Sequence, residues 1–480
     1  MTTQTGKKKK LFIGGQWVEA RTYQSLKSPY DQSELAEIPV AEKEDVTKAI
    51  DAADSARETL RKMPAHERAV ILENIAKGFE ERLEFAAEIL AKEAAKPVST
   101  ARGEVQRTIQ TYKFAAEEAK RIHGETLPLD AAQGGENRLA YTVREPIGVI
   151  AAITPFNFPM NLVAHKVGPA IASGNPVVLK PASQTPLSSL LLAEIAEKAG
   201  LPTGALNVVT GRGSVIGDVF VNDDRVKMIT FTGSPAVGIA LRNKAGLKRV
   251  TLELGSNSAV IVDKEVNIDG LIPRCVTGAF AYQGQVCISL QRVYVHEDVY
   301  EEYVEKFVEK AKELKLGDPL DPSTDVSALI SPDDVKRAGS WVNEAVQNGA
   351  KLALGGQSSE TVFLPTVLTD VDRQEKVSCQ EVFAPIVVIN KVSSVEEAIG
   401  LVNDSSYGLQ AGIYTNDVHT ALDAADRLHV GGVLINDIPT FRVDHMPYGG
   451  VKESGAGREG IKYAIEEMTE MKLVIFNRNN

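Results

Sequence analysis

The spacing of hydrophobic residues along the chain changes at Ile147. Upstream of this residue, apolar side chains recur every three or four positions, which predicts amphipathic helices over residues 46–56, 69–92 and 104–121. The stretch LFIGGQWVEA ahead of them predicts a short pair of strands. One side of the longest helix is expected to carry Val70, Ile75, Phe79, Leu83, Ala86 and Leu90. The first part of the chain is therefore predicted to be mostly helical.

Downstream of Ile147, short apolar runs alternate with helices. The runs are IGVIAAI, PVVLK, LNVVT and KMITFTG, followed from near Glu253 by SAVIVD, QRVYVH, PIVVINKV, AGIYT and GGVLIND. Strands that are apolar on both faces and separated by helices are typical of parallel sheets covered on both sides. Such sheets bind ligands at the carboxyl ends of their strands. The pattern predicts an α/β fold with two Rossmann-like, doubly wound domains.

Two segments do not fit this alternation. Residues 123–144 contain Pro128 and the pair Gly134-Gly135, which interrupt the helical pattern, and they end in the strand-like LAYTVR. At the C-terminus, KLVIF predicts one more strand that needs a partner surface. A small β excursion is therefore expected in addition to the two domains.

Composition and charge exclude several classes of protein. The chain has 480 residues, a net charge of −11 and a pI near 5.4, so it offers no broad basic surface to nucleic acid or anionic membranes. The one basic run, residues 7–10, is predicted to be a solvated tail. No apolar stretch is long enough to span a bilayer, and no signal-type segment is visible, which predicts a cytoplasmic protein.

Cysteine and histidine usage gives no sign of a disulfide framework or a metal site. The three cysteines are widely spaced, and the seven histidines form no ligand cluster, so no metal is expected. Cys275 and Cys379 are interpreted as buried or half-buried thiols.

The thiol of Cys287 is the best candidate for a nucleophile. It follows Gly284 in AYQGQVC, after a segment of small residues and before the strand-like QRVYVH. Glycine lets the backbone approach a ligand closely, so substrate can reach the thiol and a suitable environment can deprotonate it. The alternative is a small buried hydrophobic residue, because free cysteines are among the most buried side chains.

A carboxylate accompanies this thiol. VTLELGSNSAVIVD consists of two β-rich runs broken by Gly255, which leaves Glu253 at the end of the first. A half-buried carboxylate there would have a raised pKa and could act as a general base. Taken alone, a solvated or ion-paired glutamate would be the more common interpretation.

With both stretches in view, the chain resembles the aldehyde dehydrogenase superfamily. The family's glutamate motif (E-L-G-G-x-N/S) and cysteine motif (G-Q-x-C) are similar to VTLELGSN and GQVC. TPFNFP, GNPVVLKPAS, FTGS, EVFAP and PYGG occur in the family's order, so the resemblance covers almost the whole chain. The family has glycines where Ser256 and Ala384 stand here.

The resemblance implies a reaction and a role for each candidate residue. The Cys287 thiolate attacks an aldehyde carbon, hydride passes to a nicotinamide cofactor, and Glu253 activates the water that hydrolyses the thioester. Asn157 in TPFNFP would stabilise the oxyanion together with the backbone N–H of Cys287. These roles predict oxidation of a small aldehyde to its carboxylate.

The cofactor site is predicted from glycines and from the resemblance. The glycines of VVTGRGSVIG lack the usual dinucleotide spacing, whereas FTGS follows a strand and precedes a helix, which suits a pyrophosphate. The resemblance assigns Lys180 to the adenosine ribose and Glu381, beside Phe383, to the nicotinamide ribose. The full predicted set is Thr154, Pro155, Phe156, Lys180, Ser183, Gly213, Gly217, Gly233, Ser234, Glu381 and Phe383. Ser183 stands where many NAD-preferring relatives have glutamate, so we expect NADP to be accepted and preferred to NAD.

The resemblance also divides the chain. Residues 1–123 and 147–255 are predicted to form the cofactor-binding domain, and residues 256–449 the catalytic domain. Residues 124–146 and 466–480 are predicted to mediate subunit contacts in a homodimer or homotetramer.

The substrate is less defined by the sequence. KPASQTP resembles members that oxidise succinic semialdehyde, but His165 and Ala281 replace the arginines of those members. FRVDHMP is instead similar to members acting on lactaldehyde and related three-carbon hydroxyaldehydes. Arg442 is predicted to anchor an anionic or hydroxylated substrate end, with His165 and His445 also facing substrate. An ion pair between Arg442 and Asp444 at the surface is the alternative.

Three rival functions remain open at this point: a succinic semialdehyde dehydrogenase, an enzyme that transfers the acyl group to coenzyme A, and a non-catalytic structural protein on the same fold. Glu253 favours water over coenzyme A as acceptor, and the joint presence of Cys287, Glu253 and Asn157 argues against a non-catalytic protein.

Overall fold

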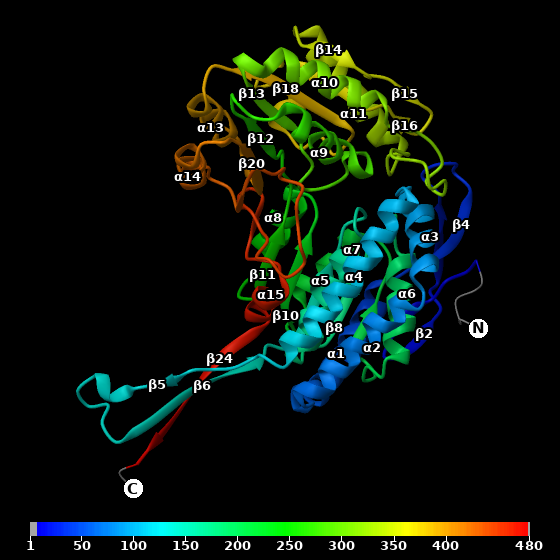
Figure 1. Cartoon of the computed structure of the whole chain (residues 1–480). Helices are drawn as coiled ribbons and strands as arrows, with labels where there is room; N and C mark the ends of the chain where they lie inside the picture. Colours follow the sequence, from blue (N-terminus) through cyan, green and yellow to red (C-terminus); the bar gives the residue numbers. More distant parts are fainter. Residues whose placement is uncertain (1–6, 479–480) are drawn as a thin grey trace.

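The computed structural model describes residues 7–478 and contains two large sheets and a small three-stranded one (Figure 1). In the first large sheet the strand order is β2-β1-β9-β8-β7-β10-β11-β23. Their bounds are β2 Gln16–Val18, β1 Leu11–Ile13, β9 Leu206–Val208, β8 Val177–Lys180, β7 Val149–Ile153, β10 Val226–Thr232, β11 Arg249–Glu253 and β23 Gly455–Ala456. The five strands from β9 to β11 are parallel. Strand order reverses beside β7, where an open parallel sheet binds its ligand.

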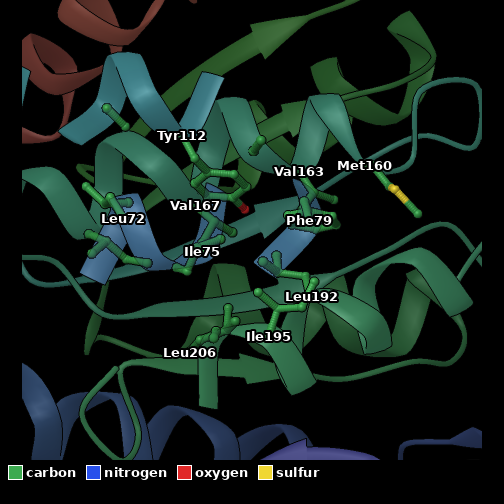
Figure 2. Packing of buried hydrophobic residues seen from close by; sticks show 14 of the residues in the cluster. Leu72, Ile75, Phe79, Tyr112, Met160, Val163, Val167, Leu192, Ile195 and Leu206 are labelled. Carbon is green, nitrogen blue, oxygen red and sulfur yellow. The ribbon is translucent and has the colours of Figure 1, made fainter. Parts of the chain in front are cut away.

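Helices cover both faces of this sheet, and β7 and β8 are therefore buried along their whole length. One face packs against α2 (Ala65–Glu80), α3 (Leu83–Ala94), α4 (Val98–Ala119), α5 (Asn161–Ser173) and α6 (Leu187–Lys198). The other face packs against α1 (Lys43–Lys62), α7 (Gly213–Asn222) and α8 (Pro235–Lys244). Figure 2 shows the first of these cores, in which Phe79 stacks on Tyr112 with ring centroids 6.0 Å apart.

The prediction of one helix over residues 69–92 is wrong. The chain forms α2 and α3 with a break at Glu81 and Arg82, and Val70 is 50% exposed instead of facing the core. The break contains neither glycine nor proline, so the sequence carries no signal for it.

The predicted solvated tail is also wrong for its later residues. Lys8 lies over the ring of Tyr23, and the backbone N–H of Lys9 donates to Glu37. The basic run therefore packs along the hairpin of β3 (Thr22–Lys27) and β4 (Glu34–Val40).

The second large sheet has the order β14-β17-β18-β13-β12-β20-β21 and is parallel except for β14. Its strands are β14 Lys351–Leu354, β17 Thr366–Thr369, β18 Ile386–Val392, β13 Arg292–His296, β12 Ala259–Val262, β20 Gln410–Tyr414 and β21 Gly432–Ile435. α9 (Ile268–Phe280) and α10 (Tyr300–Lys312) pack on one face. α11 (Pro332–Gln347), α13 (Val395–Asn403) and α14 (Val418–Arg427) pack on the other. Two doubly wound α/β units are thus present, as the alternating pattern predicts.

The β excursion pairs with the C-terminal strand. β24 (Thr469–Asn477) runs antiparallel to β6 (Arg138–Pro146), which also pairs with β5 (Thr126–Leu127). This three-stranded arm projects away from both sheets (Figure 1). The partner surface that KLVIF requires is therefore supplied by the predicted excursion; residues 479–480 lie outside the described part.

The remaining elements are short connections: β15 Ser358–Ser359, β16 Val362–Phe363, β19 Tyr407–Gly408, β22 Val451–Lys452, α12 Lys376–Cys379 and α15 Ile461–Glu467. After the second sheet, β23 returns the chain to the first sheet and pairs with β11, so that Gly455 lies opposite Glu253. Within residues 7–478, no helix combines the length and apolar character needed to cross a membrane.

Candidate active site

Cys287 lies in a loop that follows α9 and is held by unusual backbone geometry. Tyr282 and Gln283 have left-handed φ values of 48° and 56°. At Gly284 (φ 69°) a Cβ atom would lie 2.2 Å from the carbonyl oxygen of Ala384, so only glycine fits. The loop presents the thiol to a cavity of about 190 Å³. Cys287 is half-buried, which excludes the interpretation as a fully buried hydrophobic residue.

The Asn157 side chain lies next to this thiol. Its Nδ2 is 3.8 Å from the Cys287 Sγ and donates to the carbonyl oxygen of Gln285 at 3.0 Å. The second N–H of the amide is directed at this thiol, so it can also donate to an oxygen atom bonded to the carbon that the thiol attacks. The arrangement suits an oxyanion site.

The protein environment disfavours the Cys287 thiolate. Burial raises the pKa of the thiol to about 12, and the carboxylate of Glu381 adds to the rise, whereas the Asn157 amide opposes it. Burial is the main cause of this rise, and the carboxylates of Glu381 and Glu253 add to it, so the protein alone does not lower the pKa of the thiol.

Glu253 is the last residue of β11 in the first sheet, and it is buried. Burial, and then the nearby Glu459 carboxylate, raise the pKa of Glu253 well above its usual range. Its Oε2 atom is buried with no hydrogen-bond partner among the described residues. Gly449 gives it room, because a Cβ there would lie 2.9 Å from the Glu253 Oε1 atom. A carboxyl group with a raised pKa and a free oxygen can act as a base toward water.

Glu381 is positioned by the stretch that departs from the family motif. Its Oε1 accepts from the backbone N–H of Ser256 at 3.0 Å, and burial raises its pKa to about 8. The Ser256 hydroxyl bonds to the Ser258 hydroxyl instead, at 3.0 Å. Ser256 thus serves Glu381 through its backbone, so replacing glycine at this position leaves the contact intact. Phe383 packs edge-on against Phe156, with centroids 5.7 Å apart.

A cavity of about 720 Å³ opens at the carboxyl ends of β7, β8 and β10. Nine of the eleven predicted cofactor residues line it: Thr154, Pro155, Phe156, Lys180, Ser183, Gly213, Gly217, Gly233 and Ser234. Glu381 and Phe383 line a smaller adjoining hollow with Gly284. The hydroxyls of Thr154 and Thr232 are buried there without a partner, which suits a polar ligand. The first turn of α8 also faces this cavity through Ala236 and Val237 and offers an anion-binding helix end. The residues present therefore fit a dinucleotide.

The amine of Lys180 is a buried charged group of this cavity without a partner among the described residues. It makes no hydrogen bond or ion pair with residues 7–478, and burial lowers its pKa to about 8. A Cβ on Gly213, where α7 begins, would lie 3.8 Å from the Lys180 Nζ. Ser183 donates to the Gly211 carbonyl oxygen at 3.2 Å. An anion bound here would restore the charge that burial opposes.

The cavity at Cys287 contains two arginines. Arg107 and Arg442 line it together with Asn161, Thr440 and Tyr448. The guanidinium of Arg442 lies 3.7 Å from the ring centroid of Tyr448, and its Nη2 donates to Glu459 at 3.0 Å. The alternative of a surface ion pair between Arg442 and Asp444 is not found, because Asp444 bonds instead to Arg107, Asn161 and His165.

The two predicted substrate histidines lie outside this cavity. His165 is buried behind it, with its Nε2 2.9 Å from Asp444 and 3.2 Å from the Arg442 Nη2. His445 is exposed and packs on Phe114, with ring centroids 4.9 Å apart. His165 can therefore act on a substrate in this cavity only through its contact with Arg442. His445 does not line the cavity.

Sequence reasoning missed Arg107, Lys166 and Glu459. Lys166 donates to Glu459 at 3.0 Å and to Thr230 at 3.1 Å. Arg107 is on α4, separated in sequence from every motif, and its signal is only an arginine in an otherwise ordinary helix. In the part of the chain that the structure describes, no group of three or more His, Cys, Asp or Glu side chains is arranged to hold a metal ion.

A dinucleotide-sized cavity at the switch point of one Rossmann-type sheet, next to a thiol carried by a second sheet, is typical of a nicotinamide-dependent oxidoreductase with a cysteine nucleophile. Residues 17–474 match the aldehyde dehydrogenase family. The chain belongs to the aldehyde dehydrogenase family, and the predicted fold and enzyme class are confirmed.

Relatives and solved structures of this family cover nearly the whole chain. The 3-sulfolactaldehyde dehydrogenase of Priestia megaterium is 49% identical over 97% of this chain and 98% of its own. The lactaldehyde dehydrogenase of Methanocaldococcus jannaschii is 43% identical over 98% and 100%. Aldehyde dehydrogenase 21 from Physcomitrella patens, solved with the product succinate, has a TM-score of 0.97 and 42% identity, covering 99% of each chain. Glyceraldehyde-3-phosphate dehydrogenase GapN from Methanocaldococcus jannaschii, solved with NADP, has a TM-score of 0.92 and 43% identity over 95% and 100%.

Proposed function

We propose that this aldehyde dehydrogenase oxidises a short anionic hydroxyaldehyde, of the 3-sulfolactaldehyde type, to its carboxylate with NADP. The observation that supports the substrate class is the pair Arg107 and Arg442 in the same small cavity as Cys287. The Nε atom of Arg442 is buried with no partner among the described residues. A buried guanidinium with an unused donor favours an anionic ligand.

In the proposed reaction, the Cys287 thiol gives its proton to solvent, the Sγ bonds to the aldehyde carbon, and the resulting oxyanion accepts hydrogen bonds from the Asn157 Nδ2 and the Cys287 backbone N–H. Thr154, Lys180, Ser183 and Glu381 would hold a nicotinamide dinucleotide. Bound in its oxidised form, that group supplies a hydride acceptor and a positive charge. Loss of hydride leaves a thioester on Cys287. Glu253 then takes a proton from water, the water oxygen bonds to the acyl carbon, and the C–S bond breaks to release the carboxylate and the thiol.

The substrate is decided by comparing kcat/KM for 3-sulfolactaldehyde, lactaldehyde, glyceraldehyde 3-phosphate, succinic semialdehyde and a simple aliphatic aldehyde. We expect the sulfonated substrate to give the highest value. Succinic semialdehyde is the second candidate, because a structure 42% identical to this chain contains succinate. A preference for the aliphatic aldehyde would contradict the anionic assignment. Coenzyme A is not expected to change the rate, since Glu253 is placed to activate water.

Arg442→Gln tests the anionic anchor. The substitution removes the charge and leaves a shorter polar side chain, so kcat/KM for 3-sulfolactaldehyde should fall at least about tenfold more than for uncharged lactaldehyde. This ratio corresponds to the loss of a charge-assisted hydrogen bond, roughly 1.5–3 kcal/mol. Because Arg442 also bonds to Glu459, both substrates will be affected to some extent. Arg107→Gln provides a second measurement on the other arginine. Equal losses for the two substrates would reduce Arg442 to a residue that only organises the site.

Ser183→Glu tests the cofactor preference. The unpartnered Lys180 amine beside Ser183 favours a phosphate on the adenosine ribose, and serine, unlike glutamate, does not repel it. A carboxylate at this position should lower kcat/KM for NADP by about tenfold or more and leave that for NAD unchanged or higher. Ser183→Ala is the control that removes the hydroxyl without adding charge. If wild type cannot use NADP, or Ser183→Glu keeps full NADP activity, this residue does not discriminate.

We further propose that the three-stranded arm mediates a homodimer or homotetramer. Five of its large apolar side chains are 37–57% exposed: Leu139, Met471, Leu473, Ile475 and Phe476. Apolar side chains gathered on a projecting arm favour contact with another subunit. The domain division predicted above, with residues 124–146 and 466–480 as oligomerisation segments, remains our proposal, as does a cytoplasmic location, where a reactive thiol stays reduced.

A further inference from the structure

Lys96, in the turn between α3 and α4, forms a buried ion pair with Glu104 of α4 that no step of the proposed reaction uses. The Lys96 and Glu104 side chains have no exposed surface and form an ion pair with each other. The Lys96 Nζ also donates to the backbone carbonyl oxygen of Asn157 at 2.7 Å. The ammonium group therefore bonds directly to the residue that carries the candidate oxyanion donor.

Glu104 holds the other side of the same loop. Its Oε1 accepts from the backbone N–H groups of Met160 at 2.9 Å and Asn161 at 3.2 Å. The ion pair thus bonds to the chain at Asn157 and again three and four residues later. The ion pair therefore holds the segment between β7 and α5 at two points, Asn157 and the residues Met160 and Asn161.

The same turn binds the loop of the nucleophile. The Tyr282 hydroxyl donates to the carbonyl oxygen of Ala94 at 3.1 Å, and the Gln283 Nε2 donates to that of Ala95 at 2.9 Å. The Lys96 Nζ lies 4.3 Å from the ring centroid of Tyr282 and 3.8 Å from that of Phe158. Tyr282 and Gln283 are the residues with left-handed backbone, a conformation that persists only when surrounding contacts hold it.

We infer that Lys96 and Glu104 are positioning residues that set the Asn157 amide relative to the Cys287 thiol. One N–H of Asn157 is committed to Gln285, so the direction of the other depends on where the backbone of Asn157 lies. A displacement of about 1 Å in such a donor lowers a rate by about 100-fold. Stability alone is a weak reason for the pair, because apolar or neutral side chains of similar shape often replace a buried ion pair without loss. The inference rests on the proposed role of Asn157.

The test replaces both members together, as Lys96→Met with Glu104→Gln, so that no buried charge is left unpaired. Glutamine can still accept from Met160 and Asn161, whereas methionine cannot bond to the Asn157 carbonyl. We expect the double variant to keep its thermal unfolding midpoint within a few degrees and its affinity for NADP, while kcat for the best aldehyde falls at least about tenfold. The control is Arg82→Met with Glu194→Gln, which removes another partly buried ion pair, between the α2–α3 break and α6, away from both cavities. Its kcat should stay within about twofold of wild type.

A cycle with Asn157→Ala separates positioning from a general structural effect. If the pair acts through Asn157, the double variant will lower kcat in the wild-type background but not in the Asn157→Ala background. The inference is overturned if the fold-losses in kcat from the double variant and from Asn157→Ala multiply when the two are combined. It is also overturned if the double variant folds and has wild-type kcat. Should the double variant fail to fold, Glu104→Gln alone is measured in the same cycle, and the same comparison of kcat with and without Asn157→Ala decides. If Asn157→Ala itself leaves kcat unchanged, the proposed oxyanion role is wrong, which is a distinct outcome.

Discussion

Cys287→Ala will abolish aldehyde oxidation, with kcat lowered by roughly 10⁴-fold or more. The thiol is the atom that bonds to the aldehyde carbon in the proposed reaction, and no other cysteine lines either cavity. Affinity for NADP, measured by titration calorimetry, should change little, because the residues that line the large cavity are untouched.

The matched control for this substitution is Cys379→Ala. The Cys379 thiol is also half-buried, but it bonds to the Gln374 carbonyl outside both cavities. We expect this variant to keep kcat within about twofold of wild type. Substantial turnover by Cys287→Ala would refute the covalent mechanism. An inactive Cys379→Ala would show that loss of activity is not specific to the Cys287 thiol.

Glu253→Gln should have the second largest effect, lowering steady-state kcat by about 10²–10⁴-fold. An amide cannot take a proton from water, so the reaction should stop at the thioester. Rapid mixing should show a burst of about one reduced cofactor per Cys287, and mass spectrometry should find the acyl group on that residue. Hydroxylamine, which attacks thioesters without a base, should restore part of the turnover.

The pH dependence provides an independent reading of the same residue. Burial raises the pKa of Glu253, so its basic form becomes more abundant as pH rises, and wild-type deacylation should speed up accordingly. The Glu253→Gln variant should lose this rise. If the variant lacks the burst but hydrolyses the thioester normally, Glu253 acts in forming the thioester and not in its hydrolysis.

The sequence could predict the sheets and the motif residues because each rests on a local signal. Continuous apolar runs indicated β7 and β8, and glycine after a strand indicated the start of α8. Nine predicted cofactor residues line one cavity because they lie at the carboxyl ends of adjacent parallel strands or in the loops and helices that follow them. Residues 313–385 carry weaker periodicity, and their helix α11 was not anticipated.

The sequence could not predict the partners of the buried charges. Arg442 is two residues from Asp444 in the sequence, yet it pairs with Glu459, and Asp444 pairs with Arg107 on α4. Lys96 lies in a turn and Glu104 in a helix, neither within a motif, and their contacts with Asn157 and Met160 join segments far apart in the sequence. Such pairings depend on how separate elements pack, and hydrophobic periodicity carries no information about them.

The return of the chain to the first sheet has a consequence for how the protein folds during synthesis. β23 supplies the edge next to β11, and Ile461, Ile465 and Met468 complete the core beneath α4 and α5. The Ser454 hydroxyl donates to the Gly255 carbonyl across 199 residues. A ribosome must therefore synthesise the chain as far as Met468 before the unit built on the first sheet can close. Until then the edge of β11, with Leu252, stays unpaired and is open to pairing with another chain.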